Sequence, residues 1–293
     1  MTDAVATAPA EIVPVLPTRR ELPIWRLLLR RPSFVIGAAI LLFWIVCAIF
    51  GNAIAPHDPL AQDLLRLNKP PSAAHWFGTD PLGRDVLSRV IVGSRTILIV
   101  TPLATLLGTV LGTALGLAMG YFGGLLDALV SRLVEAVLAL PAVIIIFMFV
   151  VALGSSVRTL IIVIGFIFTP LVARTVRSSV QVERQLDYLS SARLLGERPA
   201  RIMFVEILPN VIPTVVVEFT VRLGYAIFAV ATLAFLGFGV QLSTPSWGSD
   251  INASYGLLGA GYWWETLFPA LAIASLVIAI NLVADSTQQV VAG

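Results

Sequence analysis

Six long apolar windows limit what this chain can fold into. A helix needs about 20 apolar residues to cross the hydrocarbon core of a bilayer, and a soluble domain of 293 residues could not bury so many such windows. The windows are residues 33–54, 96–121, 125–153, 160–176, 211–238 and 267–284. Only 12% of the residues are charged, against about 25% in an average soluble domain. The sequence therefore predicts an all-α polytopic membrane protein with six transmembrane helices.

The remaining composition excludes several classes of protein. The net charge of +2 is too small and too scattered for a nucleic-acid-binding surface. The single cysteine, Cys47, cannot form an intramolecular disulfide. The first twenty residues lack an apolar core, so we expect no cleavable signal peptide. Four prolines inside or beside the windows are expected to begin or kink helices: Pro141, Pro209, Pro213 and Pro269.

Arginine positions predict the orientation in the membrane. Cytoplasmic loops carry an excess of Lys and Arg, and five arginines precede the first window, so the N-terminal tail is predicted to be cytoplasmic. Six spans then return the C-terminus to the cytoplasm. The loop between the fourth and fifth windows falls on the same side and carries six arginines from Arg174 to Arg201. The segment 239–264, predicted to lie outside, has no basic residue.

These features divide the chain into four parts. We expect a cytoplasmic tail (1–32), a first transmembrane helix (33–54), an extracytoplasmic segment containing a short helix (55–93) and a five-helix core (94–288). The core includes the polar cytoplasmic loop 178–208.

Four glycines recur at every fourth position of the second window: Gly108, Gly112, Gly116 and Gly120. This spacing places them on one helix face, where the backbone of another helix can approach closely. We interpret them as a helix-packing surface rather than as part of a pore.

Two pairs of opposite charges lie inside apolar windows. Arg132 and Glu135 are three residues apart, and Glu218 precedes Arg222 by four, the better order for a helical pair. Ionisable residues in a membrane are costly and indicate function by default. Because each has a local partner, the sequence favours structural ion pairs near the cytoplasmic side, with a role in gating or conduction as the alternative.

Motifs for catalysis and cofactor binding are absent. The single lysine, Lys69, is followed by proline, so there is no phosphate-binding loop, and no nucleophile or metalloprotease motif occurs. His57 and His75 share the outer segment with Asp58, Asp63, Asp80 and Asp85. Imidazole suits nickel and zinc, but two loop histidines eighteen residues apart are more often solvated, so we predict no metal, no catalytic residue and no bound cofactor.

The loop Leu186 to Asn210 is long and polar although apolar windows flank it. Residues 186–195 are good helix formers, and Gly196 stands where such a helix would end. Pro199 suits the first turn of a second helix running through residues 202–208. A helix–glycine–helix unit on the cytoplasmic surface would fit a groove in another protein.

This loop resembles the cytoplasmic loop of ATP-binding cassette (ABC) importer permeases. The family pattern is Glu-Ala-Ala, three residues, Gly, five residues, Ile, three residues, a polar residue, any residue and Leu-Pro-Asn. It falls here on Ser190, Ser191, Ala192, Gly196, Ile202, Glu206, Leu208, Pro209 and Asn210. Ser190 and Ser191 replace the initial Glu-Ala, and Glu206 stands where histidine is frequent; the spacing from Ala192 to Asn210 is intact.

Three further stretches narrow the resemblance to one type of subunit within this family. HWFGTDPLGRDVLSRVIVGSR (75–95), LAFLGFGVQLSTPSWG (233–248) and LFPALAIASLVIAINLVAD (267–285) are similar to the C-type membrane subunit of dipeptide, oligopeptide and nickel permeases. The matches follow the order of the family over about 33–285.

The resemblance implies a type I ABC importer permease in the cytoplasmic (inner) membrane, with both termini inside. Its implied partners are a B-type permease subunit, two ATP-binding subunits or one fused ATPase, and an extracytoplasmic substrate-binding protein. ATP and Mg would bind to the ATPase subunits and not to this chain. The implied substrate is a di- or oligopeptide, with nickel and glutathione as alternatives. A secondary transporter would leave the loop unexplained, and a scaffold would leave the charged pairs unexplained. The absent nucleophile and metal motifs argue against a membrane enzyme.

The same resemblance makes 188–196 the coupling helix, seated in a cleft of one ATPase. Gly196 would form the turn, while the apolar side chains would pack into the ATPase. Arg193, Arg198 and Arg201 would be rim charges or contacts to lipid headgroups. The residues expected to couple to the ATPase are thus Tyr188, Leu189, Ala192, Arg193, Leu195, Gly196 and Arg198.

Overall fold

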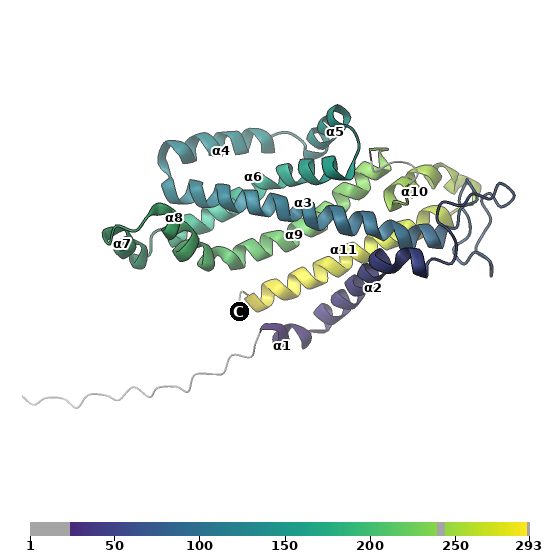
Figure 1. The fold of residues 1–293 in the computed structure, drawn as a ribbon, viewed down its shortest axis with the longest axis horizontal. Helices are drawn as coiled ribbons and strands as arrows, with labels where there is room; N and C mark the ends of the chain where they lie inside the picture. The colour runs from purple at the N-terminus through teal and green to yellow at the C-terminus, as the bar shows by residue number, and fades with distance from the viewer. Residues whose placement is uncertain (1–23, 239–243, 292–293) are drawn as a thin grey trace, which may run out of the picture.

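The computed structural model describes residues 24–238 and 244–291, and these are helical with connecting loops (Figure 1). Most of the expected tail 1–32 and the first residues of the segment 239–264 lie outside this part. The helices are α1 (Ile24–Leu29), α2 (Pro32–Ile54), α3 (Val86–Phe122), α4 (Gly124–Leu138), α5 (Ala142–Leu153), α6 (Val157–Glu183), α7 (Asp187–Leu194), α8 (Pro199–Arg201), the π-helix η1 (Ile202–Ile207), α9 (Leu208–Phe235), α10 (Trp247–Ser254), the 3-10 helix η2 (Tyr255–Ala260) and α11 (Trp264–Val291).

Five helices of the described part are long and apolar enough to cross a membrane: α2, α3, α6, the continuous helix from α8 to α9, and α11. The third window, 125–153, is not one straight span. It is divided into α4 and α5, which are bent by 85° and would make a sixth span if counted together. The break lies at Pro141, which has an extended conformation (ψ 120°) and cannot continue a helix from the preceding turn.

The second span begins earlier than its apolar window. The short helix expected within 55–93 is not a separate element, because its residues form the first turns of α3, which runs unbroken for 37 residues. Asp85 caps this helix, since its side chain accepts a hydrogen bond of 2.8 Å from the backbone N–H of Ser88. At 1.5 Å per residue, α3 is about 55 Å long.

The helix after the polar loop is also continuous with a span. Pro199 occupies its first turn, as predicted, but the helix then passes through η1 into α9. Pro209 lacks an N–H group, and in an α-helix its ring would clash with the carbonyl of Val205. The wider π turn over η1 accommodates this proline inside a long helix.

The four glycines of α3 lie against α6. A Cβ atom added at any of them would come within 2.6 or 2.7 Å of an atom of α6. Gly165 of α6 completes the contact, because a Cβ there would lie 3.0 Å from the carbonyl oxygen of Ala104 in α3. The absence of side chains lets the two backbones approach closely, which makes α3 and α6 the tightest pair of the bundle.

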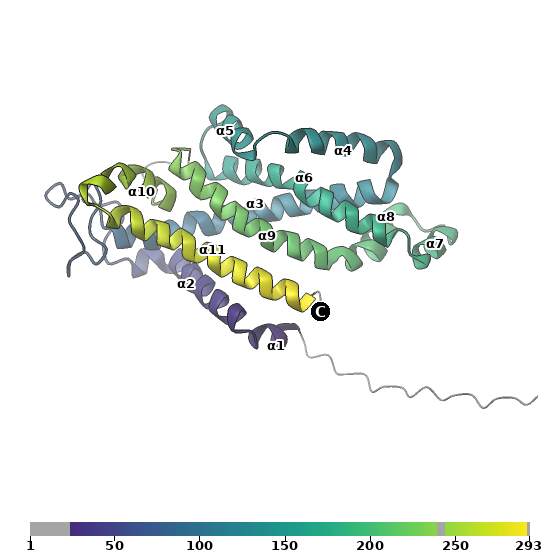
Figure 2. The same cartoon turned by 180° about the vertical axis from the view of Figure 1, so that it is seen from behind.

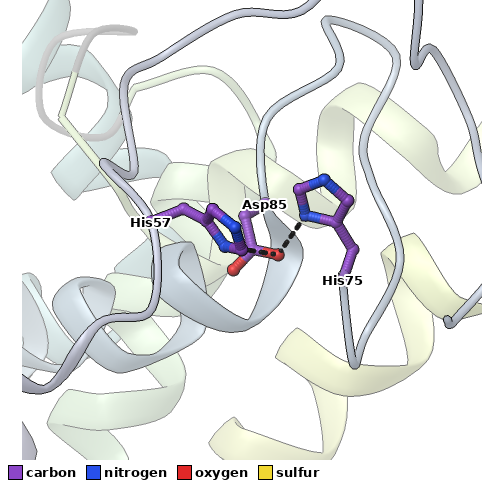
Figure 3. Close-up of side chains that lie close together, drawn as sticks. All are labelled: His57, His75 and Asp85. Atoms are coloured by element: carbon purple, nitrogen blue, oxygen red, sulfur yellow. Dashed lines mark hydrogen bonds and ion pairs between the residues drawn. The ribbon is translucent and has the colours of Figure 1, made fainter. Parts of the chain in front are cut away.

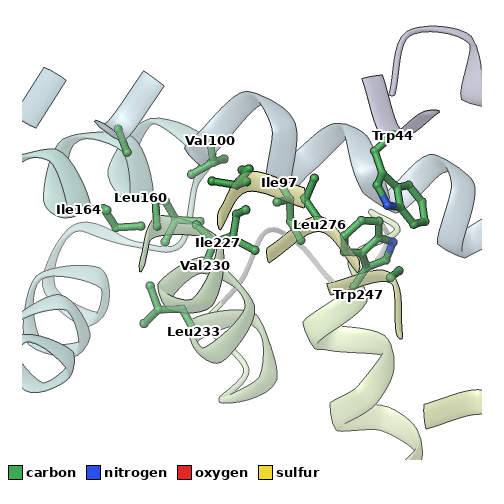
Figure 4. Packing of buried hydrophobic residues seen from close by; sticks show 14 of the residues in the cluster. Trp44, Ile97, Val100, Leu160, Ile164, Ile227, Val230, Leu233, Trp247 and Leu276 are labelled. Atoms are coloured by element: carbon green, nitrogen blue, oxygen red, sulfur yellow. The ribbon is translucent and has the colours of Figure 1, made fainter. Parts of the chain in front are cut away.

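Two apolar clusters hold the bundle together. The larger one joins α2, α3, α5, α6, α9, α10 and α11, and includes Trp44, Ile97, Leu160, Ile227, Trp247 and Leu276 (Figure 4). The smaller one lies where α7 and η1 meet α3, α6 and α9. Figures 1 and 2 show that α7 lies at one end of the bundle, while residues 55–85 lie with α10 at the other. We call residues 55–85 together with α10 the cap.

Candidate functional site

The turn after α7 has the geometry that the helix–glycine–helix pattern predicted. Gly196 has a φ of +74°, a left-handed conformation that favours glycine. Its N–H donates to the carbonyl of Arg193 at 3.0 Å, and the N–H of Glu197 donates to the carbonyl of Ala192 at 3.2 Å. These two bonds form a Schellman motif, which satisfies the last carbonyls of α7 and turns the chain sharply.

The apolar side chains that α7 exposes are not all the ones expected to contact the ATPase. Leu189 is completely buried in the smaller apolar cluster, and Ala192 packs against the same cluster. These two residues therefore pack α7 against its own bundle in this chain. Leu194 and Leu195 are 89% and 82% exposed. Leu194, which the sequence reasoning had passed over, belongs to the available apolar surface together with Leu195.

Tyr188 fixes the other side of α7. Its hydroxyl donates to Glu183 at the end of α6, and the side-chain amide of Asn210 in α9 donates to both Glu183 Oε1 (2.7 Å) and the Tyr188 hydroxyl (2.8 Å). Desolvation, and next the bond to Glu183, raise the pKa of Tyr188 to about 12. The phenol therefore stays protonated at physiological pH and keeps tying α7 to two spans.

The arginines of this region have separate environments. Arg193 lies over the ring of Tyr121 in α3, 5.5 Å from its centroid, within the range of a cation–π contact. Arg201 pairs with Glu197 at 3.6 Å. Arg198 is exposed at the start of α8. Of the three, only Arg193 joins α7 to the end of a span.

The charged pairs in the spans differ in burial. Arg222 donates to Glu218 at 2.8 and 3.0 Å in the part-buried interior, and Thr175 of α6 donates to the other oxygen of Glu218 at 2.9 Å. In contrast, Arg132 and Glu135 lie 3.7 Å apart, with side chains that are 85% and 67% exposed in this chain. The first pair joins two spans, and the second lies on an uncovered face.

A third pair was missed by the sequence reasoning. Arg177 of α6 donates to both carboxylate oxygens of Asp127 in α4, with one bond of 2.7 Å. The two residues are fifty positions apart, so a search at helical spacing could not pair them. This bidentate contact fastens α4 to the α3–α6 pair.

The motif 75–95 builds the cap. Arg84 pairs with Asp80 at 2.6 Å, and Arg89 donates from Nε to Asp250 of α10 at 3.0 Å. Burial raises the pKa of the Asp250 carboxyl, and the charge of Arg89 opposes this rise. The indole of Trp247 donates to the carbonyl of Val90 at 2.8 Å. The motif is thus explained by contacts that bind the start of α3 to α10.

The two histidines of the cap do not fit the expectation of solvated side chains. His75 is buried and its Nδ1 lies 2.8 Å from Asp85 Oδ1. His57 remains partly exposed, but its ring centroid is only 4.6 Å from that of His75. The structure therefore brings these histidines and one of the four aspartates together.

A cavity of about 530 Å³ lies among α2, α3, α9 and α11. Its lining is apolar except for Arg95, Thr101 and Thr220. Arg95 is exposed in this chain, and among the residues that the structure describes it forms no ion pair or hydrogen bond. An unpaired arginine beside apolar walls is suited to bind a carboxylate.

Comparison with known proteins gives a consistent result. Residues 112–292 match the family described as "Binding-protein-dependent transport system inner membrane component", and residues 23–71 match the "N-terminal TM domain of oligopeptide transport permease C". The dipeptide transport system permease protein DppC of Bacillus subtilis is 34% identical over 90% of this chain and 82% of its own length. The glutathione transport system permease protein GsiD of Escherichia coli O1:K1 is 38% identical over 89% of this chain and 86% of its own length.

Proposed function

Because this chain belongs to the family of inner membrane components of binding-protein-dependent transport systems, we propose that it is one of two permease subunits of an ATP-driven peptide importer. The second subunit would be a B-type permease. Two ATP-binding subunits, or one fused ATPase, would hold ATP and Mg at the α7 end, in the cytoplasm. A substrate-binding protein would deliver the peptide to the cap, outside.

The observation that carries this proposal is the exposed apolar surface at the end of α7. Leu194 and Leu195 together leave a large apolar area in water unless another protein covers it. The helix that bears them is held by Leu189, by the Tyr188 hydrogen bonds and by the Schellman turn. A rigid helix with an uncovered apolar tip is suited to transmit movement between an ATPase and the spans.

Replacing the apolar tip tests the proposal. The complex would be purified in mild detergent from cells that express this chain with its neighbouring genes. Leu194→Glu should lose the ATPase subunits while retaining the second permease, whereas Leu194→Met, which keeps an apolar side chain of similar volume, should retain both. Retention of the ATPases and normal uptake by the Leu194→Glu/Leu195→Glu double variant would overturn the proposed role of α7.

The environment of Arg95 supports a peptide over nickel as the substrate. An arginine that has no partner among the described residues attracts the carboxylate at the end of a peptide and repels a divalent cation. The apolar walls of the same cavity suit side chains of varied size. Glutathione, which carries two carboxylates, satisfies the same chemistry and remains the second candidate.

Uptake by an Arg95 variant tests this assignment. In proteoliposomes that contain the whole importer, Arg95→Gln should reduce peptide uptake at least tenfold, and Arg95→Lys should restore part of it because the positive charge remains. ATPase activity without substrate should not change. Equal uptake by all three proteins would remove Arg95 from the substrate path, and the α7 experiment would still stand as a separate test.

A further inference from the structure

Three potential metal ligands meet where the cap joins α3. In Figure 3 the rings of His57 and His75 approach the carboxylate of Asp85 from two different loops. Asp85 Oδ1 lies 2.8 Å from Nδ1 of His75 and 3.6 Å from Nδ1 of His57. One ligand atom from each of the three residues lies within 4.8 Å of the others. At zinc–ligand distances of about 2.0–2.2 Å, the ligand atoms of a tetrahedral site are about 3.4 Å apart, so small shifts would bring these atoms around one ion.

The three ligands are held by the surrounding structure. The other carboxylate oxygen of Asp85 accepts hydrogen bonds from the backbone N–H and the hydroxyl of Ser88, which leaves Oδ1 directed at the histidines. The hydroxyl of Ser88 also accepts from the backbone N–H of His57 at 3.1 Å. The backbone N–H of His75 is bound by the hydroxyl of Ser72 at 3.2 Å. Such supporting contacts orient metal ligands and reduce the cost of assembling a site.

Access for an ion is open on one side. His57 lines an open cavity of about 540 Å³, in which Asn52 and Asp58 are the other polar side chains. Its side chain is 42% exposed, whereas that of Asp85 is 2% exposed. An ion held at the three atoms would therefore have a free coordination position for water on the side of His57.

We propose that His57, His75 and Asp85 form a binding site for a divalent transition metal ion of the zinc class. Two imidazoles and one carboxylate suit zinc, cobalt or nickel, whereas calcium and magnesium prefer sites made of oxygen atoms. The ion would connect the loop that follows α2, the turn at His75 and the first turn of α3. It would therefore strengthen the cap at the end of the bundle opposite α7.

Binding requires one proton and one arginine to move. Arg66 donates to Nε2 of His75 at 3.2 Å, so in the metal-free protein Nδ1 carries the proton and donates it to Asp85. When the ion binds Nδ1, the ring loses its Nδ1 proton to water and takes up one proton from water at Nε2, so the imidazole stays neutral and no net proton is released. Arg66 must then leave His75, and Asp63, already 3.3 Å away, provides its alternative partner.

The site is tested by metal binding to the purified complex, prepared without a histidine tag. Wild-type complex equilibrated with Zn²⁺ should hold one more ion per copy of this chain than the His57→Ala complex, with at least tenfold weaker binding in the variant. Co²⁺ should give the intense visible absorption of a tetrahedral site in the wild type alone. Asp58→Asn serves as the matched control, because it removes a neighbouring side chain of the same cavity and should change neither result.

A second variant distinguishes a metal site from a purely structural cluster. Arg66→Gln removes the cation that competes with the metal ion for His75, so Zn²⁺ binding should become several-fold stronger. If the three residues were only a structural cluster, removing Arg66 would not strengthen Zn²⁺ binding. Identical Zn²⁺ content and Co²⁺ spectra in the wild type and the His57→Ala variant would overturn the proposal. Weaker binding in the Arg66→Gln variant would also overturn it.

Discussion

Adding one methyl group between α3 and α6 should measurably loosen the bundle. In a Gly116→Ala variant the new Cβ would lie 2.7 Å from the carbonyl oxygen of Ala173 and 3.0 Å from the backbone nitrogen of Arg177. Ordinary van der Waals contact begins at 3.4 Å, so the first distance is short by 3.4 − 2.7 = 0.7 Å. Both contacts are to backbone atoms, which no rotamer change can move. The two helices must therefore separate.

The size of the effect follows from two opposing terms. Overpacking of this kind costs about 1–3 kcal/mol, and replacing glycine by alanine within a helix returns about 0.5–1 kcal/mol. The net loss should be about 0–2.5 kcal/mol, with a central value of about 1 kcal/mol. Each kcal/mol corresponds to a decrease in Tm of roughly 2–4 °C for a chain of this size. Thermal unfolding of the detergent-solubilised complex, at one scan rate for all variants, measures it.

Gly224→Ala provides the control. Gly224 is also a glycine within a transmembrane helix, but its added Cβ would meet only the side-chain oxygen of Asn281, at 3.3 Å. This variant should be as stable as the wild type, since the gain in helix propensity offsets a contact that a side chain can relieve. If Gly116→Ala unfolds at the same temperature as Gly224→Ala, the close approach of α3 and α6 does not stabilise the bundle.

Three further predictions concern the α7 end and α4. Gly196→Val should abolish uptake but leave membrane insertion normal, because valine resists a φ of +74°; transport at the wild-type rate would contradict this. Asp127→Asn should lower the free energy of unfolding by about 1–2 kcal/mol, since it weakens the partly buried pair with Arg177. In the same thermal unfolding assay, the double variant Asp127→Asn/Arg177→Gln should recover part of this loss. Ultraviolet titration should find Tyr188 un-ionised until pH about 12. Because this pKa is raised on folding, the associated stability is complete below pH 10, the ordinary tyrosine value, and is lost as the pH rises through 12.

The length and spacing of apolar segments were sufficient to predict most of the fold. The turn at Gly196 was predictable because only a few residues accept a left-handed conformation at the end of a helix. The break at Pro141 was harder to predict, since proline in a membrane span can either kink a helix or end it. The start of α3 was misjudged for another reason. Arg89 and Arg95 interrupt the apolar run before residue 96, but the structure buries Arg89 against Asp250, so the helix continues through this position.

The contacts of single side chains were less predictable than the elements that carry them. Leu189 lies within α7 and Leu195 directly follows it, and only the packing of α7 on the bundle shows that the first leucine is buried and the second exposed. The pair of Asp127 and Arg177 depends on the contact of α4 with α6, which no local spacing encodes. The histidines of the cap meet because the chain folds back between positions 57 and 75. Local patterns therefore predict helices and turns, whereas tertiary packing decides which side chains are available.

One helix connects the two ends at which we place partners. The N-terminus of α3 is capped by Asp85, which is also the central ligand of the proposed metal site. At its other end Tyr121 packs against the cluster that holds Leu189 and lies beneath Arg193 of α7. Between these points the glycines let α3 pack closely against α6, and we expect the two helices to move together. If an ATPase displaced α7, the α3–α6 pair would therefore carry most of that displacement to the cap. Conversely, an ion that stiffens the cap would act on the same helix pair, so α3 and α6 are the element through which the two proposed sites would influence each other.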